Sequence, residues 1–229
     1  MDSMVTSDPS QPLLIRADAN IQIGTGHLMR CLALAQAWQD ASGRVVFLMA
    51  TESPPLDARL RTEGDVLDRY QGARKYQADL IVRITSDCPL IEPEIVDQVV
   101  QEFLERQLEI DYASNIWPRR TFPQGLDTEI MRIDVLERAW YEDRDPFWRE
   151  HVTPYIYRNP DRFRIHNVLS QVDYSAMRWT VDTPEDLTFV RQIYDYFGHD
   201  HFCWREVLKV LEEHPDWLEI NRYVQQKAV

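Results

Sequence analysis

Short apolar runs alternate with stretches whose apolar residues recur at helical spacing, and this alternation constrains the fold more than any other feature. Strands are expected over residues 13–18, 45–50, 78–85, 111–115, 126–132, 162–169 and 177–181. Helices are expected over residues 27–40, 54–63, 66–77, 93–107, 134–142, 146–158, 184–197, 203–213 and 215–226. Strands that are separated by helices favour parallel pairing, so the sequence predicts a three-layer α/β fold with a mainly parallel sheet.

Size and charge limit the class of protein. The 229 residues suit one large domain, and residues 1–12 are expected to form a disordered leader. A net charge of −13 disfavours nucleic acid and anionic lipid as partners. No apolar run approaches the roughly 18 residues that span a bilayer, and the three cysteines are odd in number and far apart. These features predict a soluble cytoplasmic protein with reduced thiols.

Two aspartates, Asp87 and Asp182, carry the strongest pattern. Each follows an apolar strand-like run and precedes a turn with a proline that leads into a helix. Ligand sites in parallel sheets lie outside the carboxyl ends of the strands, and two carboxylates there suit Mg²⁺ with substrate phosphates. The alternative is that each aspartate only caps its turn. Arg83, on the strand before Asp87, is a candidate nucleotide contact.

A glycine-containing loop precedes the first expected helix. Gly24, Thr25 and Gly26 would let backbone amides approach an anion at the helix N-terminus. His27 is a candidate general base, and Arg30, one turn along, is a candidate catalytic residue that would contact a phosphate or a carboxylate. The alternative is a structural turn, because one glycine loop is a weak signal.

A third group is a candidate sugar site. Asp127 and Glu129 alternate along an expected strand, so their side chains would share one face, with Gly125 just before them. Glu150 and His151 lie on an expected helix. The alternative is that the helical pair is a solvated surface.

Residues 65–221 resemble the cytidylyltransferase-like family of the spore coat polysaccharide biosynthesis protein. The matching segments occur in order: DVLDRY, ADLIVRITSDCPLI, FPQGLDTEI, REHVTPYIYRNPDRFRI, RWTVDTPEDL and EEHPDWLEIN. The resemblance implies a Rossmann-like nucleotidyltransferase (nucleotide-diphospho-sugar transferase) fold. It also implies transfer of CMP from CTP to a sugar, Mg²⁺ held by Asp87 and Asp182, and a possible homodimer.

Residues 13–64 resemble a different family, the UDP-sugar hydrolases of pseudaminic acid biosynthesis. RADANIQIGTGHLMRCLALAQAW carries its GxGHxxR motif, in which the histidine is the proposed base; here that is His27. The phosphate loop of the form RxxSxRLPGK, which opens cytidylyltransferases, does not occur in this sequence. We therefore expect a join near Gly64–Asp65, with segments 13–64 and 65–229 packing as one domain, and an impaired nucleotide site. The alternatives are a UDP-sugar hydrolase that uses His27, and an inactive nucleotide- or partner-binding protein.

Overall fold

The chain divides into two compact units, Met1–Ile81 and Val82–Val229. The computed structural model describes residues 12–16, 35, 39, 44–48, 66–68, 78–85 and 87–225, with side chains for 35, 39, 45 and for 78–225 except 86, 149 and 150. The boundary between the units falls inside a strand and not at the predicted join near Gly64–Asp65. That segments 13–64 and 65–229 pack as one domain stays a prediction.

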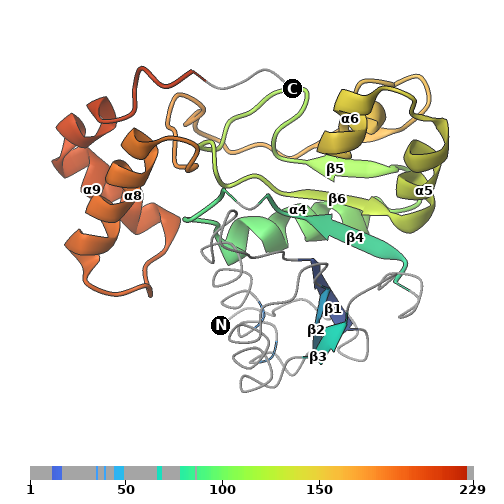
Figure 1. Ribbon diagram of the computed structural model, residues 1–229, viewed down its shortest axis with the longest axis horizontal. Coiled ribbons are helices and arrows are strands. Elements are labelled where there is room, and N and C mark those ends of the chain that lie inside the picture. Colours follow the sequence, from blue (N-terminus) through green and yellow to red (C-terminus); the bar gives the residue numbers. More distant parts are fainter. Residues whose placement is uncertain are drawn as a thin grey trace. The chain divides into compact units, whose positions relative to one another are not determined.

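The described part of the first unit contains a parallel sheet. Its strands, in spatial order, are β1 (Pro12–Arg16), β2 (Arg44–Leu48) and β3 (Val66–Asp68) (Figure 1). Leu14 pairs with Val46, and Val46 with Val66. Parallel neighbours require a crossover connection, which agrees with the predicted alternation of strands and helices.

The second unit is built on a mixed sheet. Its strands, in spatial order, are β4 (Leu80–Arg83), β6 (Glu129–Arg132), β5 (Tyr112–Ser114) and β7 (Ile165–Asn167). β5 pairs with β7 in parallel but with β6 in antiparallel orientation. The α/β class is therefore confirmed, and an antiparallel pair lies inside a sheet that the sequence predicts as mainly parallel.

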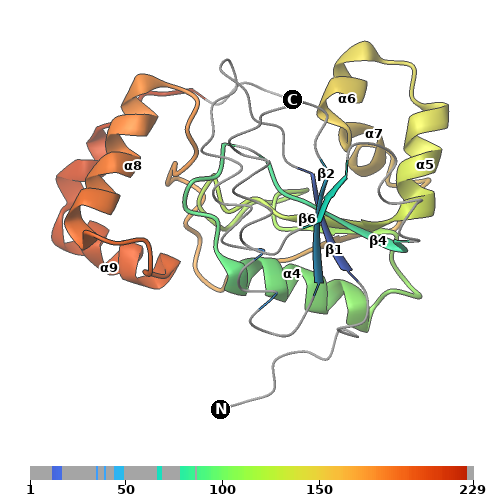
Figure 2. The ribbon, with the colours of Figure 1, turned by 60° about the horizontal axis from the view of Figure 1, so that its bottom comes forward.

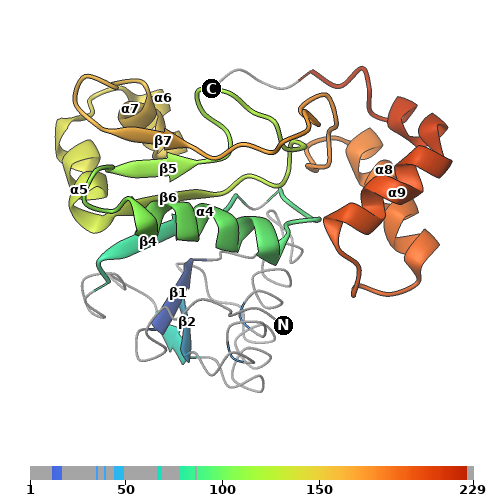
Figure 3. The same cartoon turned by 180° about the vertical axis from the view of Figure 1, so that it is seen from behind.

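Helices cover this sheet and its ends. They are α4 (Pro93–Glu105), α5 (Ile133–Glu142), α6 (Pro146–His151), α7 (Pro154–Tyr157), α8 (Pro184–Phe197), α9 (Trp204–Glu213) and the 3₁₀ helix η1 (Pro215–Glu219). α4 runs along one face of the sheet (Figure 3). α5, α6 and α7 gather at one end, and α8 and α9 gather at the other (Figure 2).

Helix α8 begins and ends at its predicted residues for local reasons. Thr183 and Asp186 form a reciprocal capping box, Pro184 occupies the first turn, and Gly198 ends the helix in the left-handed conformation. These signals lie within four residues of each helix end, so they can be recognised in the sequence.

The core includes the space between α4 and the sheet and the buried apolar faces of the other helices. α4 contributes Val99 and Phe103, and α8 contributes Phe189 and Ile193, all of which are fully buried. Each such side chain contributes about 1.5–3 kcal/mol through burial. The candidate site lies just before the starts of α4 and α8, where Asp87 and Asp182 are found.

Two predicted helices are wrong in the described residues. The start of the helix expected over 66–77 is strand β3, because Val66 and Leu67 pair with β2 and tertiary pairing outweighs the local pattern. The helix expected over 215–226 is only η1, after which the chain turns. That turn lets the buried Asn221 side chain donate to the Arg178 carbonyl at 2.8 Å.

Two further elements differ from prediction. The strand expected over 177–181 is a single bridge between Gln124 and Arg178, because the backbone turns away at Gly125 with φ 101°. The helix expected over 146–158 is divided into α6 and α7. Pro154 has no N–H to continue the helical ladder, and Val152 adopts a left-handed conformation.

Candidate functional site

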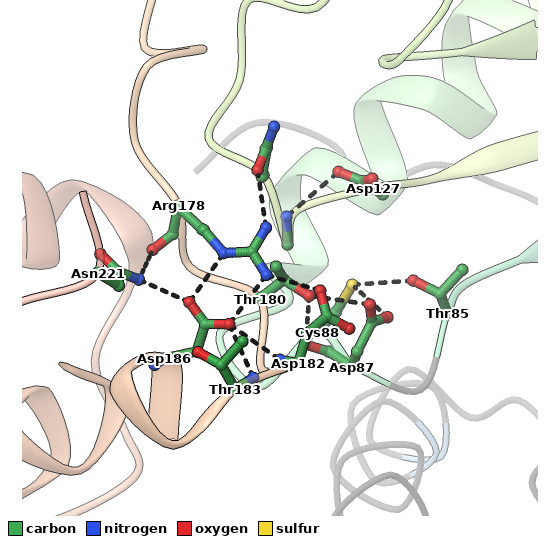
Figure 4. A network of polar contacts seen from close by, with 12 residues as sticks. Thr85, Asp87, Cys88, Asp127, Arg178, Thr180, Asp182, Thr183, Asp186 and Asn221 are labelled. Atoms are coloured by element: carbon green, nitrogen blue, oxygen red, sulfur yellow. Dashed lines mark hydrogen bonds and ion pairs between the residues drawn. The ribbon is translucent and has the colours of Figure 1, made fainter. Parts of the chain in front are cut away.

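Asp87 and Asp182 come together, although 94 residues separate them in the sequence (182 − 87 − 1). The N–H of Val181 donates to the Asp87 carbonyl at 2.8 Å, which places Asp182 one residue from that contact. The buried Thr180 hydroxyl lies 2.9 Å from Oδ2 and 3.0 Å from the carbonyl oxygen of Asp87 and donates to one of them. Figure 4 shows both carboxylates beside Thr180.

The contacts that described residues make with these two carboxylates leave them suited to a cation. No described arginine or lysine forms an ion pair with Asp87, whose Oδ1 lies 3.8 Å from the Cys88 sulfur. The Asp182 side chain is 45% exposed, and no described donor contacts its Oδ1. Within the described residues no group of three acidic, histidine or cysteine side chains forms a metal site. Two carboxylates plus substrate phosphates are nevertheless a donor set that Mg²⁺ accepts.

Cys88 supports Asp87 without being reactive. Its sulfur is 3.2 Å from the Thr85 hydroxyl. Burial, followed by the nearby Asp127 and Asp87 carboxylates, raises the pKa of the Cys88 thiol well above its ordinary value. The thiol therefore keeps its proton, and Cys88 is a buried core residue.

Asp182 is held by a buried network behind the site. Arg178 contacts Asp182 Oδ2 at 2.6 Å and grips Asp186 with Nε at 2.8 Å and Nη2 at 2.9 Å (Figure 4). Asp186 also accepts the N–H groups of Asp182 and Thr183, both at 3.0 Å, and the Asn221 amide at 3.0 Å. Burial opposes its ionisation, but these donors hold the pKa of Asp186 below its ordinary value.

Gly125 packs directly against this segment. A Cβ atom at this position would lie 2.7 Å from the backbone N of Thr180 and 2.7 Å from the backbone carbon of Trp179. The positive φ of 101° adds a second reason for glycine. The structure therefore gives Gly125 a packing role next to the aspartate pair.

Asp127 and Glu129 each face an arginine. Asp127 forms a two-point ion pair with Arg120 and accepts the N–H of Gly125 at 3.3 Å. Glu129 is 2% exposed and pairs with Arg83. Burial and the Glu129 carboxylate raise the pKa of Tyr112 well above its ordinary value, so its phenol donates to Glu129. Arg83 and Glu129 thus neutralise one another; their assignment to nucleotide and sugar stays a prediction.

Among the remaining predicted residues, the structure describes the side chain of His151, and this residue is not grouped with the aspartates. His151 ends α6 with its ring 4.6 Å from that of Phe147, and α6 and α8 lie at different ends of the sheet (Figure 1). The side chain of Glu150 lies outside the described residues. So do Gly24, Thr25, Gly26, His27 and Arg30, and the hydrolase hypothesis that rests on them stays a prediction.

The most important residues that sequence reasoning missed are Arg178, Thr180 and Asp186. Asp186 was visible as a capping residue, but its bond to Arg178 was not. Arg178 and Asp186 lie four residues before and after Asp182, a symmetric spacing that could have indicated a shared contact.

The second unit is thus an α/β protein in which two carboxylates, those of Asp87 and Asp182, come together beside a mixed sheet. A cytidylyltransferase family model matches residues 58–226. The chain therefore belongs to the cytidylyltransferase family, whose members are transferases.

Similar proteins agree with this family. The chain is 36% identical over 171 residues to the uncharacterized protein MJ1063 of Methanocaldococcus jannaschii, covering 73% of this chain and 68% of that protein. It is 27% identical over 163 residues to the spore coat polysaccharide biosynthesis protein SpsF of Bacillus subtilis, covering 68% and 64%. The chain thus spans only about two thirds of these relatives' lengths.

Solved structures share the fold. A cytidylyltransferase from Leptospira borgpetersenii superposes with a TM-score of 0.74 at 26% identity, covering 96% of this chain and 98% of that one. CMP:2-keto-3-deoxy-manno-octonic acid synthetase complexed with CTP superposes with a TM-score of 0.52 at 14% identity, covering 82% and 99%. The predicted nucleotidyltransferase fold is confirmed. Separately, no described helix is long and apolar enough to cross a membrane.

Proposed function

We propose that the protein transfers the CMP group of CTP to a sugar in surface-polysaccharide synthesis and releases pyrophosphate. The observation that carries this proposal is the pairing of Asp87 with Asp182 in a member of the cytidylyltransferase family. Such a reaction requires a negatively charged triphosphate, and we expect it in the cytoplasm, where CTP is available.

Asp87 and Asp182 would hold Mg²⁺, which when bound offsets the charge of the triphosphate. The residues of the chain supply fixed positions for these ligands. Thr180 fixes Asp87 through its hydroxyl, and the hydrogen bond from Val181 keeps the two aspartate-bearing segments together. An acceptor hydroxyl of the sugar then attacks the α-phosphorus and releases its proton to water, and the oxygen that bridges to the β-phosphate leaves with pyrophosphate.

The site also has a departure from the family pattern. The arginine- and lysine-containing phosphate loop of the family does not occur in the sequence, so we expect weak binding of CTP. The missing charges would cost about 10²–10³ in rate for each oriented stabilising group. The protein would then be a slow transferase, and its preferred sugar would have to be found by a substrate panel.

The experiment is a pyrophosphate-release assay with CTP, Mg²⁺ and a panel of sugars and sugar acids. We expect release that depends on CTP and metal and that falls by about 10²–10³-fold in Asp87→Asn. Asp134→Asn is the matched control, because Asp134 is 63% exposed at the start of α5, at the other end of the sheet. Equal activity of wild type and Asp87→Asn would refute the assignment.

A further inference from the structure

Arg178 is the basic side chain that contacts Asp182, and it does so from a buried position. Its side chain is 7% exposed, whereas that of Asp182 is 45% exposed. Arg178 therefore connects the interior of the protein to an exposed carboxylate; Figure 4 shows it between Asp186 and Asp182. An exposed ion pair is usually weak, but an arginine that is fixed by other partners has less side-chain entropy to lose.

Asp186 fixes the guanidinium. Nε and Nη2 of Arg178 contact the two oxygens of Asp186 at 2.8 and 2.9 Å, and Asp186 is fully buried. Two parallel hydrogen bonds of this kind set the plane of the guanidinium as well as its position. Nη2 is thereby directed to Asp182 Oδ2 at 2.6 Å.

The arginine also reaches the loop that contains Gly125. Nη1 of Arg178 lies 3.3 Å from the Gln124 side-chain oxygen, and the Arg178 carbonyl accepts from Asn221 at 2.8 Å. Asp186 and Gln124 thus hold the Arg178 guanidinium, and Asn221 holds the Arg178 backbone. A role limited to capping α8 would not require the contact with Asp182, because Thr183 and Asp186 already form the capping box.

Negative side chains outnumber positive ones among the described residues around the aspartate pair. Asp87, Asp182 and Asp186 provide three carboxylates, and among the described ion pairs only Arg178 offsets any of them. Without Arg178 the two ligand carboxylates would attract a free cation strongly. With Arg178, part of that attraction is cancelled at Asp182.

We propose that Arg178 is a positioning residue that orients the Asp182 carboxylate and offsets its charge, so that the free protein binds a divalent cation weakly and nucleotide phosphates complete the site. This inference rests on the proposed function, because it requires Asp182 to be a metal ligand. Under this inference the network of Arg178, Asp186 and Asn221 orients a metal ligand for the reaction and also stabilises the fold.

The test is a Mn²⁺ titration of the protein without nucleotide, followed by electron paramagnetic resonance of the free ion, together with the pyrophosphate assay. In Arg178→Gln we expect Mn²⁺ to bind at least about threefold more tightly, because a nearby positive charge is removed. Turnover of CTP should fall by about tenfold or more, because Asp182 is no longer oriented. A purely structural arginine would weaken both properties together.

Two controls separate the possible failures. Arg132→Gln removes an arginine from another ion pair, with Asp111, and should change neither Mn²⁺ affinity nor turnover by more than about twofold. Asp182→Asn should weaken Mn²⁺ binding; if it does not, the metal site of the proposed function is wrong. If Asp182→Asn weakens binding but folded Arg178→Gln does not tighten it, only the positioning role is overturned.

Arg178→Lys keeps the inference testable if Arg178→Gln does not fold. Lysine retains the charge but lacks the planar fork that reaches both aspartates. We expect Mn²⁺ affinity within about twofold of wild type and turnover reduced by about tenfold. Wild-type turnover in this variant would overturn the role in orientation.

Discussion

Two clusters of aspartate and arginine lie in the second unit, and they are arranged in opposite ways. In one cluster, Arg178 contacts two aspartates, Asp182 and Asp186. In the other, Asp111 is contacted by two arginines, Arg132 and Arg164. The same residue types therefore give an excess of negative charge in one place and a saturated carboxylate in the other.

The Asp111 cluster is closed. Its Oδ1 accepts from Arg132 and Arg164, both at 2.8 Å, and its Oδ2 accepts from the backbone N–H of Arg164 at 2.8 Å. The side chain is 9% exposed, which leaves no room for a ligand. It joins the residue before β5 to the residue before β7, so its role is to stabilise the sheet.

The Asp182 cluster is open. One carboxylate oxygen faces Arg178 and the other has no described donor, while the side chain is 45% exposed. A buried carboxylate whose two oxygens both accept hydrogen bonds is typical of a structural ion pair, whereas an exposed carboxylate in excess of the basic groups is typical of a site. The comparison predicts that changes in the Asp182 cluster lower activity, whereas changes in the Asp111 cluster lower stability.

The largest expected effect is the loss of activity in Asp182→Asn. Pyrophosphate release should fall by about 10²–10³-fold, because one of the two metal ligands loses its charge. The free energy of unfolding should change by less than about 0.5 kcal/mol, because the side chain is exposed. Urea unfolding and the pyrophosphate assay on the same preparation check both values. A large loss of stability would show that this cluster is structural too.

A smaller effect on a different property is expected for Asp111→Asn. The free energy of unfolding should fall by about 2 kcal/mol, because the variant weakens charged hydrogen bonds to a buried side chain. The partial exposure of the two arginines limits the loss. Turnover per folded molecule should stay within about twofold of wild type. Urea unfolding, with the folded fraction used to normalise the assay, is the measurement. Equal stability of variant and wild type would contradict the structural role.

The smallest expected effect is a change with pH in the difference between the free energies of unfolding of wild type and Asp111→Asn. Hydrogen bonds from Arg164, and then from Arg132, hold the pKa of Asp111 well below its usual range, against the opposing effect of burial. A carboxyl with a lowered folded-state pKa stabilises the protein above its unfolded pKa of about 3.9. That contribution is lost as the pH falls towards the folded pKa. Wild type should therefore lose stability below about pH 4 more steeply than Asp111→Asn, as measured by urea unfolding at several pH values.

The sequence by itself determined the elements whose causes are local. The bounds of α8 follow from Thr183, Pro184, Asp186 and Gly198, all at the helix ends. The turns that carry Asp87 and Asp182 could likewise be predicted, because aspartate and proline signals act over a few residues. The class of fold followed from the alternation of strands and helices.

Only the tertiary structure decided which residues surround the pair of Asp87 and Asp182. Arg178 lies 43 residues from Asn221 and 54 from Gln124, and no local spacing predicts such contacts. The same holds for strand β3, which forms because β2 is beside it, and for Gly125, which lies against Thr180. Hydrogen bonds and close packing between distant segments depend on the folded arrangement of the whole unit, whereas capping and turn formation depend on the neighbouring residues alone.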